Sequence, residues 1–220
     1  LATGIELTKM MEERVRRDEV RSDFKLLQIC VGKMLYLREL VNLGIAGTFQ
    51  NTRPFRHLPI VANIMVPCLN RRASRRGEWV KQVEARAMDA LAFVGISDLA
   101  LEPASALSQG DLKRLEVARA IASEPELLLL DEPLGGLNPA ESGLLSKSIK
   151  RLHKGGRFGR LHSEGPAVLM IEHKLRELMA IVDRVIVMNY GEIIADAPPA
   201  EVVKDARVIE AYLGTDHAAA

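Results

Sequence analysis

The chain has 220 residues, of which 48% are hydrophobic and 27% are charged. This length and composition suit one globular domain, with or without a small subdomain, and exclude a disordered chain. The 30 Lys and Arg residues nearly balance the 29 Asp and Glu residues, so the formal charge of +1 indicates no global preference for nucleic acid.

The first predicted strand lies within residues 43–50, where the small, apolar sequence LGIAGTFQ ends in a polar loop. Before it, charges of both signs alternate over residues 12–21, which is typical of a solvated helix. Residues 51–58 form the loop, and Pro54 prevents a helix from continuing through it. The longest mostly apolar stretch, 59–69, is too short to span a bilayer, and we expect no signal peptide.

Two helices are predicted next. Apolar residues recur at spacings of three and four over 80–94, and Gly95 is suited to end that helix. The basic run RRASRR at 71–76 is interpreted as a solvated connector, with attraction to an anionic membrane leaflet as the alternative. After a linker at 103–107, the second helix begins at Ser108.

The rest of the chain alternates strands and helices, which indicates an α/β core with a parallel sheet. Continuous apolar runs predict buried strands, and a polar turn between two runs predicts a hairpin. The predicted elements are, in order, a strand at 127–130, a helix at 141–153, a basic loop at 154–166, a buried strand at 167–171, a helix at 174–181, a hairpin of 185–188 and 192–195, and a last helix near 199–213.

The sequence LLLLDEP at 127–133 is the strongest local signal for chemistry. A buried parallel strand delivers Asp131 and Glu132 to its carboxyl end, where α/β proteins bind their ligands. The first carboxylate suits Mg2+, which prefers oxygen ligands, and the second can polarise an attacking water in phosphoryl transfer. Taken alone, the segment is also consistent with a strand followed by a polar turn.

A second signal is LSQG at 107–110, which runs directly into a helix. Ser108 is a good N-cap residue, and Asp111 completes a capping-box-like pair. A glycine beside a helix N-terminus lets backbone N–H groups approach a phosphate, and the helix dipole favours the anion. An ordinary capped helix is the alternative for these residues alone.

Order and spacing add to these signals. Gln50, LSQG, the Asp-Glu pair, LGGLNP at 134–139 and His173 follow one another along the chain. In this order the chain resembles the ATP-binding subunits of ABC transporters, with their glutamine loop, LSGGQ signature, Asp-Glu strand, D-loop and switch histidine. The resemblance covers roughly residues 40–214. It implies a P-loop-NTPase-like (RecA-like) α/β core with a parallel sheet and a helical signature subdomain.

The resemblance assigns a role to each matching residue. Glu132 would be the general base, and His173 would contact the γ-phosphate and position the attacking water. Ser108 and Gly110 would grip the γ-phosphate of ATP bound to the opposite subunit. By itself, His173 is also consistent with a strand-end histidine that is hydrogen-bonded locally.

The remaining matches concern magnesium and the subunit contacts. Asp131 would support Mg2+, and Gln50 would sense both Mg2+ and the permease, although alone it reads as a loop residue. Leu137 and Asn138 would lie in the D-loop that spans the dimer. The cofactors implied are therefore ATP and Mg2+.

The sequences of four segments are most similar to those of the import subunits for branched-chain amino acids. These segments are TFQNTRPF at 48–55, GLNP at 136–139, NYGEIIA at 189–195 and VIEAYLG at 208–214.

We expect the chain to have three parts: an atypical N-terminal segment at 1–40, a nucleotide-binding core of 41–54 and 119–220, and a helical subdomain of 55–118 that carries the signature.

The sequence departs from the family pattern at the phosphate-binding loop, GxxxxGK[ST], which the 220 residues do not contain. At the Gly32-Lys33 pair, Met34 stands in place of Ser or Thr, and Leu27 in place of the first glycine. We therefore expect weak ATP binding on the chain's own face, because that loop supplies most of the contacts to the phosphates. The atypical N-terminus that begins at Leu1 leaves a missing segment, a damaged frame or natural divergence as possibilities.

Two smaller departures follow. Asp111 stands where the family usually has glutamine, and its negative charge is expected to weaken the contact with a partner's nucleotide. The loop at 154–166 is longer than the family's turn; it is interpreted as a solvated surface loop, with binding to acidic lipid or nucleic acid as the alternative. Cys30 and Cys68 have no ligand partners at metal-site spacing and are expected to be buried thiols of a reduced compartment.

The leading hypothesis is an ABC-type ATPase subunit that powers an importer for branched-chain or similar amino acids. It would lie peripherally at the cytoplasmic membrane face, with permease subunits, a second ATP-binding subunit and, indirectly, a substrate-binding protein as partners, and without nucleic acid. The alternative is a non-catalytic ABC subunit that only completes a partner's ATP site in trans. A soluble ABC protein of nucleic-acid maintenance or translation would want a coiled-coil insertion or second cassette, and the sequence has neither.

Overall fold

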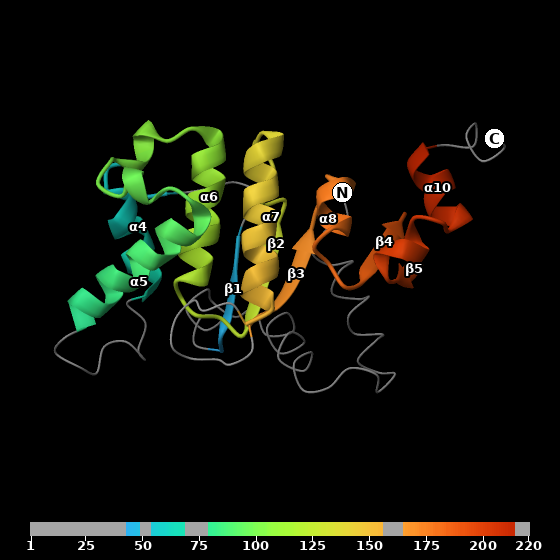
Figure 1. The fold of residues 1–220 in the computed structure, drawn as a ribbon, viewed down its shortest axis with the longest axis horizontal. Coiled ribbons are helices and arrows are strands. Elements are labelled where there is room, and N and C mark those ends of the chain that lie inside the picture. The colour runs from blue at the N-terminus through green and yellow to red at the C-terminus, as the bar shows by residue number, and fades with distance from the viewer. Residues whose placement is uncertain (1–42, 49–53, 69–78, 156–164, 214–220) are drawn as a thin grey trace. The chain divides into compact units, whose positions relative to one another are not determined.

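The structure is a computed structural model that describes residues 43–48, 54–68, 79–155 and 165–213 (Figure 1). These residues fall into two compact units, one that ends at Ile181 and one that begins at Val182. Gln50, the helix predicted at 12–21 and the connector at 71–76 lie outside the described residues. The expected division into an N-terminal segment, a core and a helical subdomain stays a prediction.

The first unit alternates helices and parallel strands, as expected for an α/β core. Its elements are β1 (Ile45–Gly47), α4 (Ile60–Cys68), α5 (Trp79–Val94), short 3-10 turns at Ser97–Leu99 and Ala104–Ala106, α6 (Gln109–Ile121), β2 (Leu127–Asp131), α7 (Pro139–His153), β3 (Ala167–Ile171) and α8 (Leu175–Met179). The linker predicted at 103–107 therefore contains a helical turn. The helix predicted from residue 80 is confirmed as α5, and Gly95 follows it with a φ of +76°, the left-handed conformation that glycine adopts easily.

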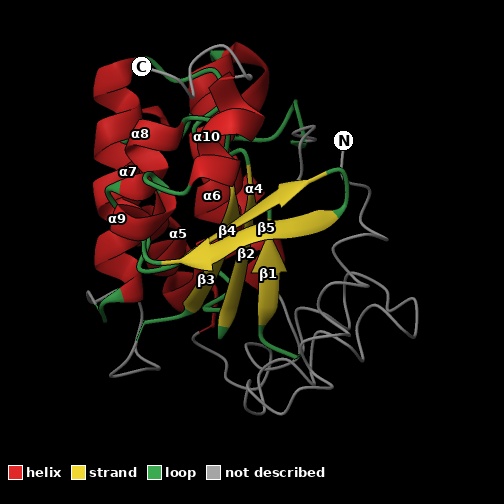
Figure 2. Cartoon of the chain, turned by 90° about the vertical axis from the view of Figure 1, so that its right-hand side faces the viewer, coloured by secondary structure: helices red, strands yellow, loops and turns green. Residues whose placement is uncertain are grey.

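The three strands of the first unit form a parallel sheet in the order β1-β2-β3 (Figure 2). β2 lies in the centre, and Leu128 and Leu130 of this strand are buried. Gly47 of β1 faces Leu129 so closely that a Cβ on it would lie 3.0 Å from the Leu129 carbonyl oxygen. Glycine is therefore favoured where β1 approaches β2.

β3 differs from the prediction of a fully buried strand. Its predicted bounds of 167–171 are confirmed, and in the sheet Ala167 lies opposite Leu127 and Ile171 opposite Asp131. However, Ala167 and Ile171 are exposed, and the three residues between them are only half-buried. The reason is position, because among the described strands β3 pairs on one side only, with β2.

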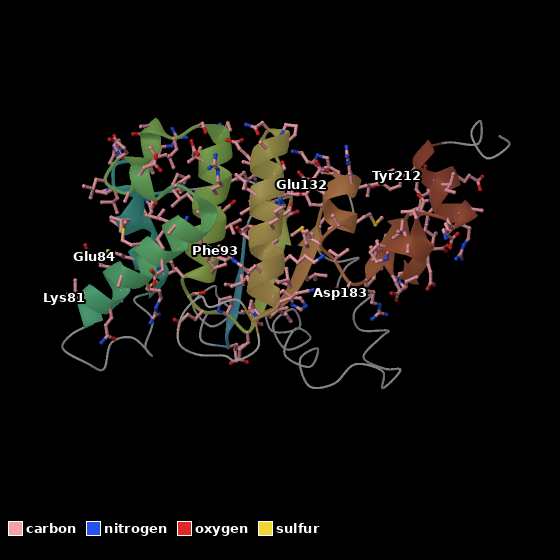
Figure 3. The ribbon with its side chains drawn as sticks, in the orientation of Figure 1. Lys81, Glu84, Phe93, Glu132, Asp183 and Tyr212 are labelled. Atoms are coloured by element: carbon pink, nitrogen blue, oxygen red, sulfur yellow. The ribbon has the colours of Figure 1, made fainter. Side chains whose placement is uncertain are left out.

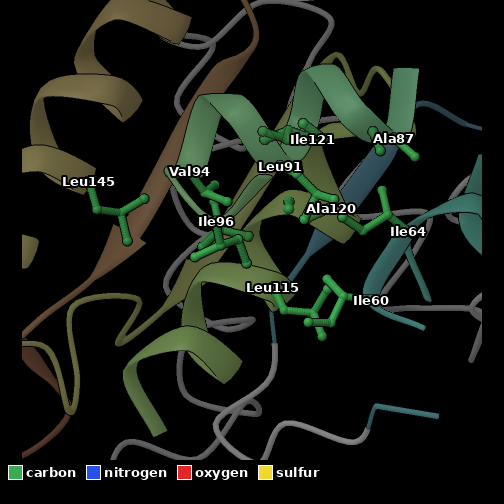
Figure 4. Close-up of a cluster of buried hydrophobic side chains, with 14 of the residues drawn as sticks. Ile60, Ile64, Ala87, Leu91, Val94, Ile96, Leu115, Ala120, Ile121 and Leu145 are labelled. Carbon is green, nitrogen blue, oxygen red and sulfur yellow. The ribbon is translucent and has the colours of Figure 1, made fainter. Parts of the chain in front are cut away.

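The core of the first unit forms where α4, α5 and α6 pack together and α6 contacts β1 and β2. Figure 4 shows buried apolar side chains from these helices meeting, together with Leu145 of α7. The apolar stretch at 59–69 supplies α4, whose nine residues are too few to cross a bilayer. No helix in the described part of the chain has both the length and the apolar character of a membrane span.

Asn63 is a fully buried polar residue in this core. Its Oδ1 accepts the backbone N–H of Phe55 at 2.7 Å, and its Nδ2 donates to the carbonyls of Phe55 and Pro59, both at 3.1 Å. Burial of an amide is tolerated only when its hydrogen bonds are made. Asn63 therefore fixes the loop before α4 to the body of the helix.

The second unit contains the predicted hairpin, β4 (Val185–Asn189) and β5 (Glu192–Ala197), which pair antiparallel. Tyr190 and Gly191 between them have φ angles of +46° and +86°, as a tight two-residue hairpin turn requires. The single helix predicted near 199–213 is wrong. The structure has two helices, α9 (Pro199–Val202) and α10 (Ala206–Leu213), separated by a break at Asp205.

The chemistry of Asp205 explains the break. Its Oδ1 accepts the backbone N–H of Arg207 at 2.9 Å, a bond that competes with continuous helix. The Arg207 guanidinium also pairs with this carboxylate at 2.8 Å. The side-chain hydrogen bonds from Arg207 lower the pKa of Asp205.

Candidate functional site

The predicted carboxylates lie where two adjacent parallel strands end. Asp131 is the last residue of β2, and its partner in the register is Ile171, the last residue of β3. Glu132 follows the first strand, and Glu172 and His173 follow the second. Parallel strands present their carboxyl ends at one edge, and this edge therefore gathers the titratable side chains.

Glu132 stands at a sharp turn of the backbone, and its place at the end of β2 is labelled in Figure 3. Its φ is +45°, an uncommon conformation for a residue with a side chain, with a cost of about 1 kcal/mol. The Glu132 N–H donates to the Ile171 carbonyl at 2.9 Å, and the Glu132 carbonyl accepts the N–H of Gly135 at 3.1 Å. These bonds hold the strained turn beside the end of β3.

The structure brings Glu132 and His173 together. The Glu132 Oε1 lies 3.7 Å from the His173 Nδ1, and the two side chains are 36% and 62% exposed. A carboxylate and an imidazole in such proximity, both open to water, can accept a proton from a water and orient it. The structure thus places these two candidate site residues side by side, while their catalytic roles stay predictions.

Asp131 is positioned by β1. Its backbone N–H donates to the Thr48 Oγ1 at 3.0 Å, and the Thr48 N–H donates to the Leu129 carbonyl at 2.9 Å. Thr48 is buried, and the sequence analysis assigned it no role. Its place in the TFQ segment at the end of a strand is the signal that would have identified it.

The metal prediction involves Asp131 and Gln50, and only Asp131 lies in the described part. Its carboxylate is an oxygen donor of the kind that Mg2+ prefers. Within the described residues, no group of three or more His, Cys, Asp or Glu side chains has the arrangement of a metal site. The Asp131 carboxylate would fit a magnesium ion as one of its oxygen ligands.

The signature turn begins at Ser108, which caps α6 as predicted. The Ser108 Oγ accepts the Asp111 N–H at 3.1 Å and donates to the Asp111 Oδ2 at 2.6 Å. The capping-box-like pair is thus confirmed, with the difference that the Asp111 carboxylate bonds the Ser108 hydroxyl. This hydroxyl bonds Asp111 and neither Glu132 nor His173, so the structure does not join the signature turn to the carboxylate edge through Ser108.

Gly110 contacts the loop of residues 134–138 that follows Glu132. It is buried, and a Cβ on it would lie 3.1 Å from the Leu137 Cδ2. Any larger residue would push Leu137 away. The small size of Gly110 thus sets how closely the signature turn approaches this loop.

Asn138 serves as the N-cap of α7. Its Oδ1 accepts the Glu141 N–H, and the Glu141 Oε2 accepts the Asn138 N–H, both at 3.0 Å, which completes a capping box. Pro139 at the first helical position strengthens this start. The predicted D-loop residue therefore has a local structural role in addition to any role in a dimer.

Arg114 links the signature turn to α7, and the sequence analysis missed it. Its guanidinium lies 3.1 Å from the Asp111 Oδ1 and 2.6 Å from the Glu141 Oε1. Asp111 and Arg114 stand three residues apart on one helix, a spacing that predicts an ion pair. The bond to Glu141 joins residues distant in sequence and had no local signal.

Comparison with known proteins gives two family matches. A model described as ABC transporter matches residues 10–135, and one described as branched-chain amino acid ATP-binding cassette transporter matches residues 192–218. The first covers more than half of the chain.

Individual proteins similar to this chain agree with the two family matches. The chain is 33% identical over 189 residues to the high-affinity branched-chain amino acid transport ATP-binding protein LivG of Salmonella typhimurium, covering 80% of this chain and 70% of that protein. It is also 33% identical to the probable LivG of Archaeoglobus fulgidus, covering 80% and 68%. A solved structure of MJ1267, an ATP-binding cassette of an ABC transporter, matches with a TM-score of 0.63 and 27% identity, over 80% of this chain and 70% of that one.

Proposed function

The chain belongs to the ABC transporter family of ATP-binding subunits, and on that premise we propose that it powers the import of branched-chain or similar amino acids. By family it is an ABC-type ATPase with a P-loop-NTPase fold. The observation that carries the hydrolytic part of the proposal is the approach of Glu132 and His173 to 3.7 Å at the carboxyl edge of a parallel sheet.

In this proposal the edge residues divide the work of hydrolysis. Glu132 accepts the proton of the attacking water, and its exposure leaves room for that water. His173 orients the water and contacts the γ-phosphate. Asp131 helps to hold Mg2+, which when bound neutralises charge on the phosphates.

The signature turn acts on a second subunit. Ser108 and Gly110 contact the nucleotide bound by a partner, and Leu137 and Asn138 lie at the dimer contact. The packing of Gly110 against Leu137 is consistent with this, because it places the signature turn beside the loop of 134–138. Gln50 would relay closure of the dimer to the permease.

The transport partners follow from the relatives rather than from the site. The C-terminal family match at residues 192–218 and the two LivG proteins support a role with integral-membrane permease subunits, and indirectly with a substrate-binding protein. The subunit would then lie peripherally at the cytoplasmic face of the membrane. Loss of leucine, isoleucine and valine uptake after deletion of its gene is the expected result, and unchanged uptake of all three would contradict the substrate class.

Hydrolysis is tested on the purified chain with Mg-ATP, by phosphate release. Glu132→Gln should abolish release, since the amide cannot accept the proton. Glu126→Gln is a matched control, because Glu126 is exposed and precedes the other end of β2. If the parent releases phosphate, an equal rate in the Glu132→Gln variant would contradict the assigned general base, whereas no release by the parent would contradict hydrolysis by this chain.

One observation favours a second function. The sequence contains no GxxxxGK[ST] segment, which supports a non-catalytic subunit that completes a partner's ATP site in trans. The chain would then raise the ATPase rate of a partner with an intact phosphate loop. Under this second function, Ser108→Ala should remove the increase in the partner's ATPase rate, and Glu132→Gln should leave that increase unchanged. Under the first function, Glu132→Gln should abolish ATP hydrolysis by the chain itself.

A further inference from the structure

The two neighbours of His173 both bond to the segment that follows Glu132. The Glu172 Oε1 accepts the N–H of Leu134 at 2.7 Å. Its Oε2 accepts the N–H groups of His173 and Lys174 at 3.2 and 3.3 Å. One carboxylate thus ties the turn after β3 to the turn after β2, by bonds that its charge strengthens.

Lys174 makes a second connection to the same segment. Its Nζ donates to the Leu137 carbonyl at 2.9 Å and to the Ser142 Oγ at 3.1 Å. Ser142 is fully buried at the start of α7, so this ammonium is partly withdrawn from water. Both sequence neighbours of His173, Glu172 and Lys174, are therefore hydrogen-bonded to the segment that follows Glu132.

The far end of α8 is tied as well. Lys150 of α7 donates its Nζ to the Ala180 carbonyl at 2.8 Å, just beyond α8. The short helix after His173 is therefore attached to α7 at both ends, and the turn that carries His173 follows α7 and the loop of 134–138.

The His173 side chain itself is 62% exposed, so packing alone does not orient it. Its backbone N–H is held by Glu172, and its side chain lies near Glu132. We propose that Glu172 and Lys174 are positioning residues that direct His173 toward Glu132 by fixing its turn to the loop of 134–138. The importance of this arrangement for hydrolysis rests on the proposed function; the arrangement itself does not.

The proposal has a consequence for the signature turn. Leu137, whose carbonyl accepts the Lys174 bond, also packs against Gly110. Gly110, Leu137, Lys174 and His173 thus form a continuous series of contacts. A shift of the loop of 134–138 would therefore move the His173 turn.

The test measures how much the Glu132 side chain changes the NMR chemical shift of His173, in the absence of nucleotide. The chain is labelled with 13C at the Cε1 of its 5 histidines. The resonance of His173 is assigned as the one that is lost in the His173→Gln variant. The shift of this resonance caused by Glu132→Gln is then measured in three backgrounds: the parent, Glu172→Ala and Lys174→Met. We expect a clear shift in the parent and its loss in both variants, because the coupling of two groups depends on their held distance.

Controls separate positioning from a general loss of structure. Glu177→Ala and Arg176→Ala change side chains of α8 that take no part in these bonds, and they should preserve the shift. Lys174→Arg retains the donors and should preserve it too. If Glu172→Ala does not fold, Glu172→Gln replaces it and should reduce the shift, because the charge of the acceptor is lost.

Amide exchange provides the second readout. Exchange of the Leu134 N–H should become faster in the Glu172 variants and stay unchanged in the Glu177→Ala control. A full Glu132-dependent shift of His173 in Glu172→Ala and Lys174→Met, or unchanged Leu134 exchange, would overturn the proposal. Absence of ATP hydrolysis by the chain would overturn only the proposed function, since neither measurement involves nucleotide.

Discussion

At the scale of single residues, Asp111 shows how one charge changes a site. Its carboxylate accepts the hydroxyl of Ser108 at 2.6 Å and lies 3.1 Å from the Arg114 guanidinium. The sequence analysis expected this charge to weaken contact with a partner's phosphate. The structure adds a specific cause, because a hydroxyl that donates to Asp111 does not donate to phosphate at the same time.

Replacing Asp111 with Gln should therefore increase the ATPase rate of a partner that has an intact phosphate loop. The amide removes the negative charge and frees the Ser108 hydroxyl, and the expected gain is several-fold, about 1 kcal/mol. Phosphate release from the mixed subunits is measured. Asp89→Gln, at an exposed position of α5, is the control, and a rate equal to that of the parent would count against this role of Asp111.

Cys68 illustrates a second residue effect, that of burial. The thiol is fully buried and donates to the Ala122 carbonyl at 3.2 Å. Burial is the main cause that raises the pKa of Cys68 from 9.0 to about 11; nearby Glu124 also raises it, and Arg86 opposes the rise. The expectation of a buried thiol is confirmed for Cys68, whereas Cys30 lies outside the described residues.

This shift predicts a loss of stability in alkali. The folded thiol keeps its proton above pH 9 while the unfolded thiol releases it, so the contribution is complete below pH 9 and falls as pH rises toward 11. The expected loss is about 3 kcal/mol at most, since each unit of pKa difference corresponds to about 1.4 kcal/mol. Urea unfolding at pH 8 and pH 10.5 is compared for the parent and Cys68→Ala, whose stability should depend less steeply on pH; parallel curves would exclude the effect.

At the scale of elements, β2 is central to both the core and the site. It pairs with β1 and β3, and its alternate residues Leu128 and Leu130 are buried. The apolar run predicted this strand correctly. The same pattern at 167–171 did not predict burial, because β3 has a described neighbour on one side only.

Leu128→Ala should destabilise the chain by about 2–5 kcal/mol, the usual cost of emptying a buried leucine site. Leu144 of α7 is 69% exposed and provides the matched control. Leu144→Ala should change the free energy of unfolding by no more than about 0.5 kcal/mol. Chemical denaturation of both variants gives the comparison, and similar losses would show that β2 is not central to the core.

At the scale of the whole molecule, the site is made by segments far apart in sequence. Thr48, Asp131 and the Glu172–Lys174 turn meet because three parallel strands end at one edge. The signature turn contacts the loop of 134–138 through Gly110 and Leu137, and the Arg114–Glu141 pair links it to the start of α7.

Glu132→Gln should trap an ATP-bound dimer only when a partner supplies the phosphate-binding loop. The variant keeps the shape of the edge and blocks proton transfer, so nucleotide stays bound once a complete site has formed. Size-exclusion chromatography with Mg-ATP is run on the variant alone and with an intact partner subunit. A stable dimer of the variant alone would show that its own residues hold ATP without GxxxxGK[ST].

The sequence by itself determined the α/β class and most of the order of the elements, although it did not predict α4, and it supplied the candidate residues for the chemistry. These features depend on local periodicity, on Ser108 as a cap and on the order of motifs along the chain, all of which are present before folding. It did not determine that the last predicted helix breaks at Asp205, where a side chain competes with the helix.

Only the tertiary structure decided how the site is held together. The bonds from Glu172 to Leu134, from Lys174 to Leu137 and from Arg114 to Glu141 join segments that have no local relation in sequence. Their partners are set by the parallel register of β2 and β3 and by the tertiary fold that brings α6 to the start of α7. Residue type can name a carboxylate or an imidazole, but the distance between two of them exists only in the folded chain.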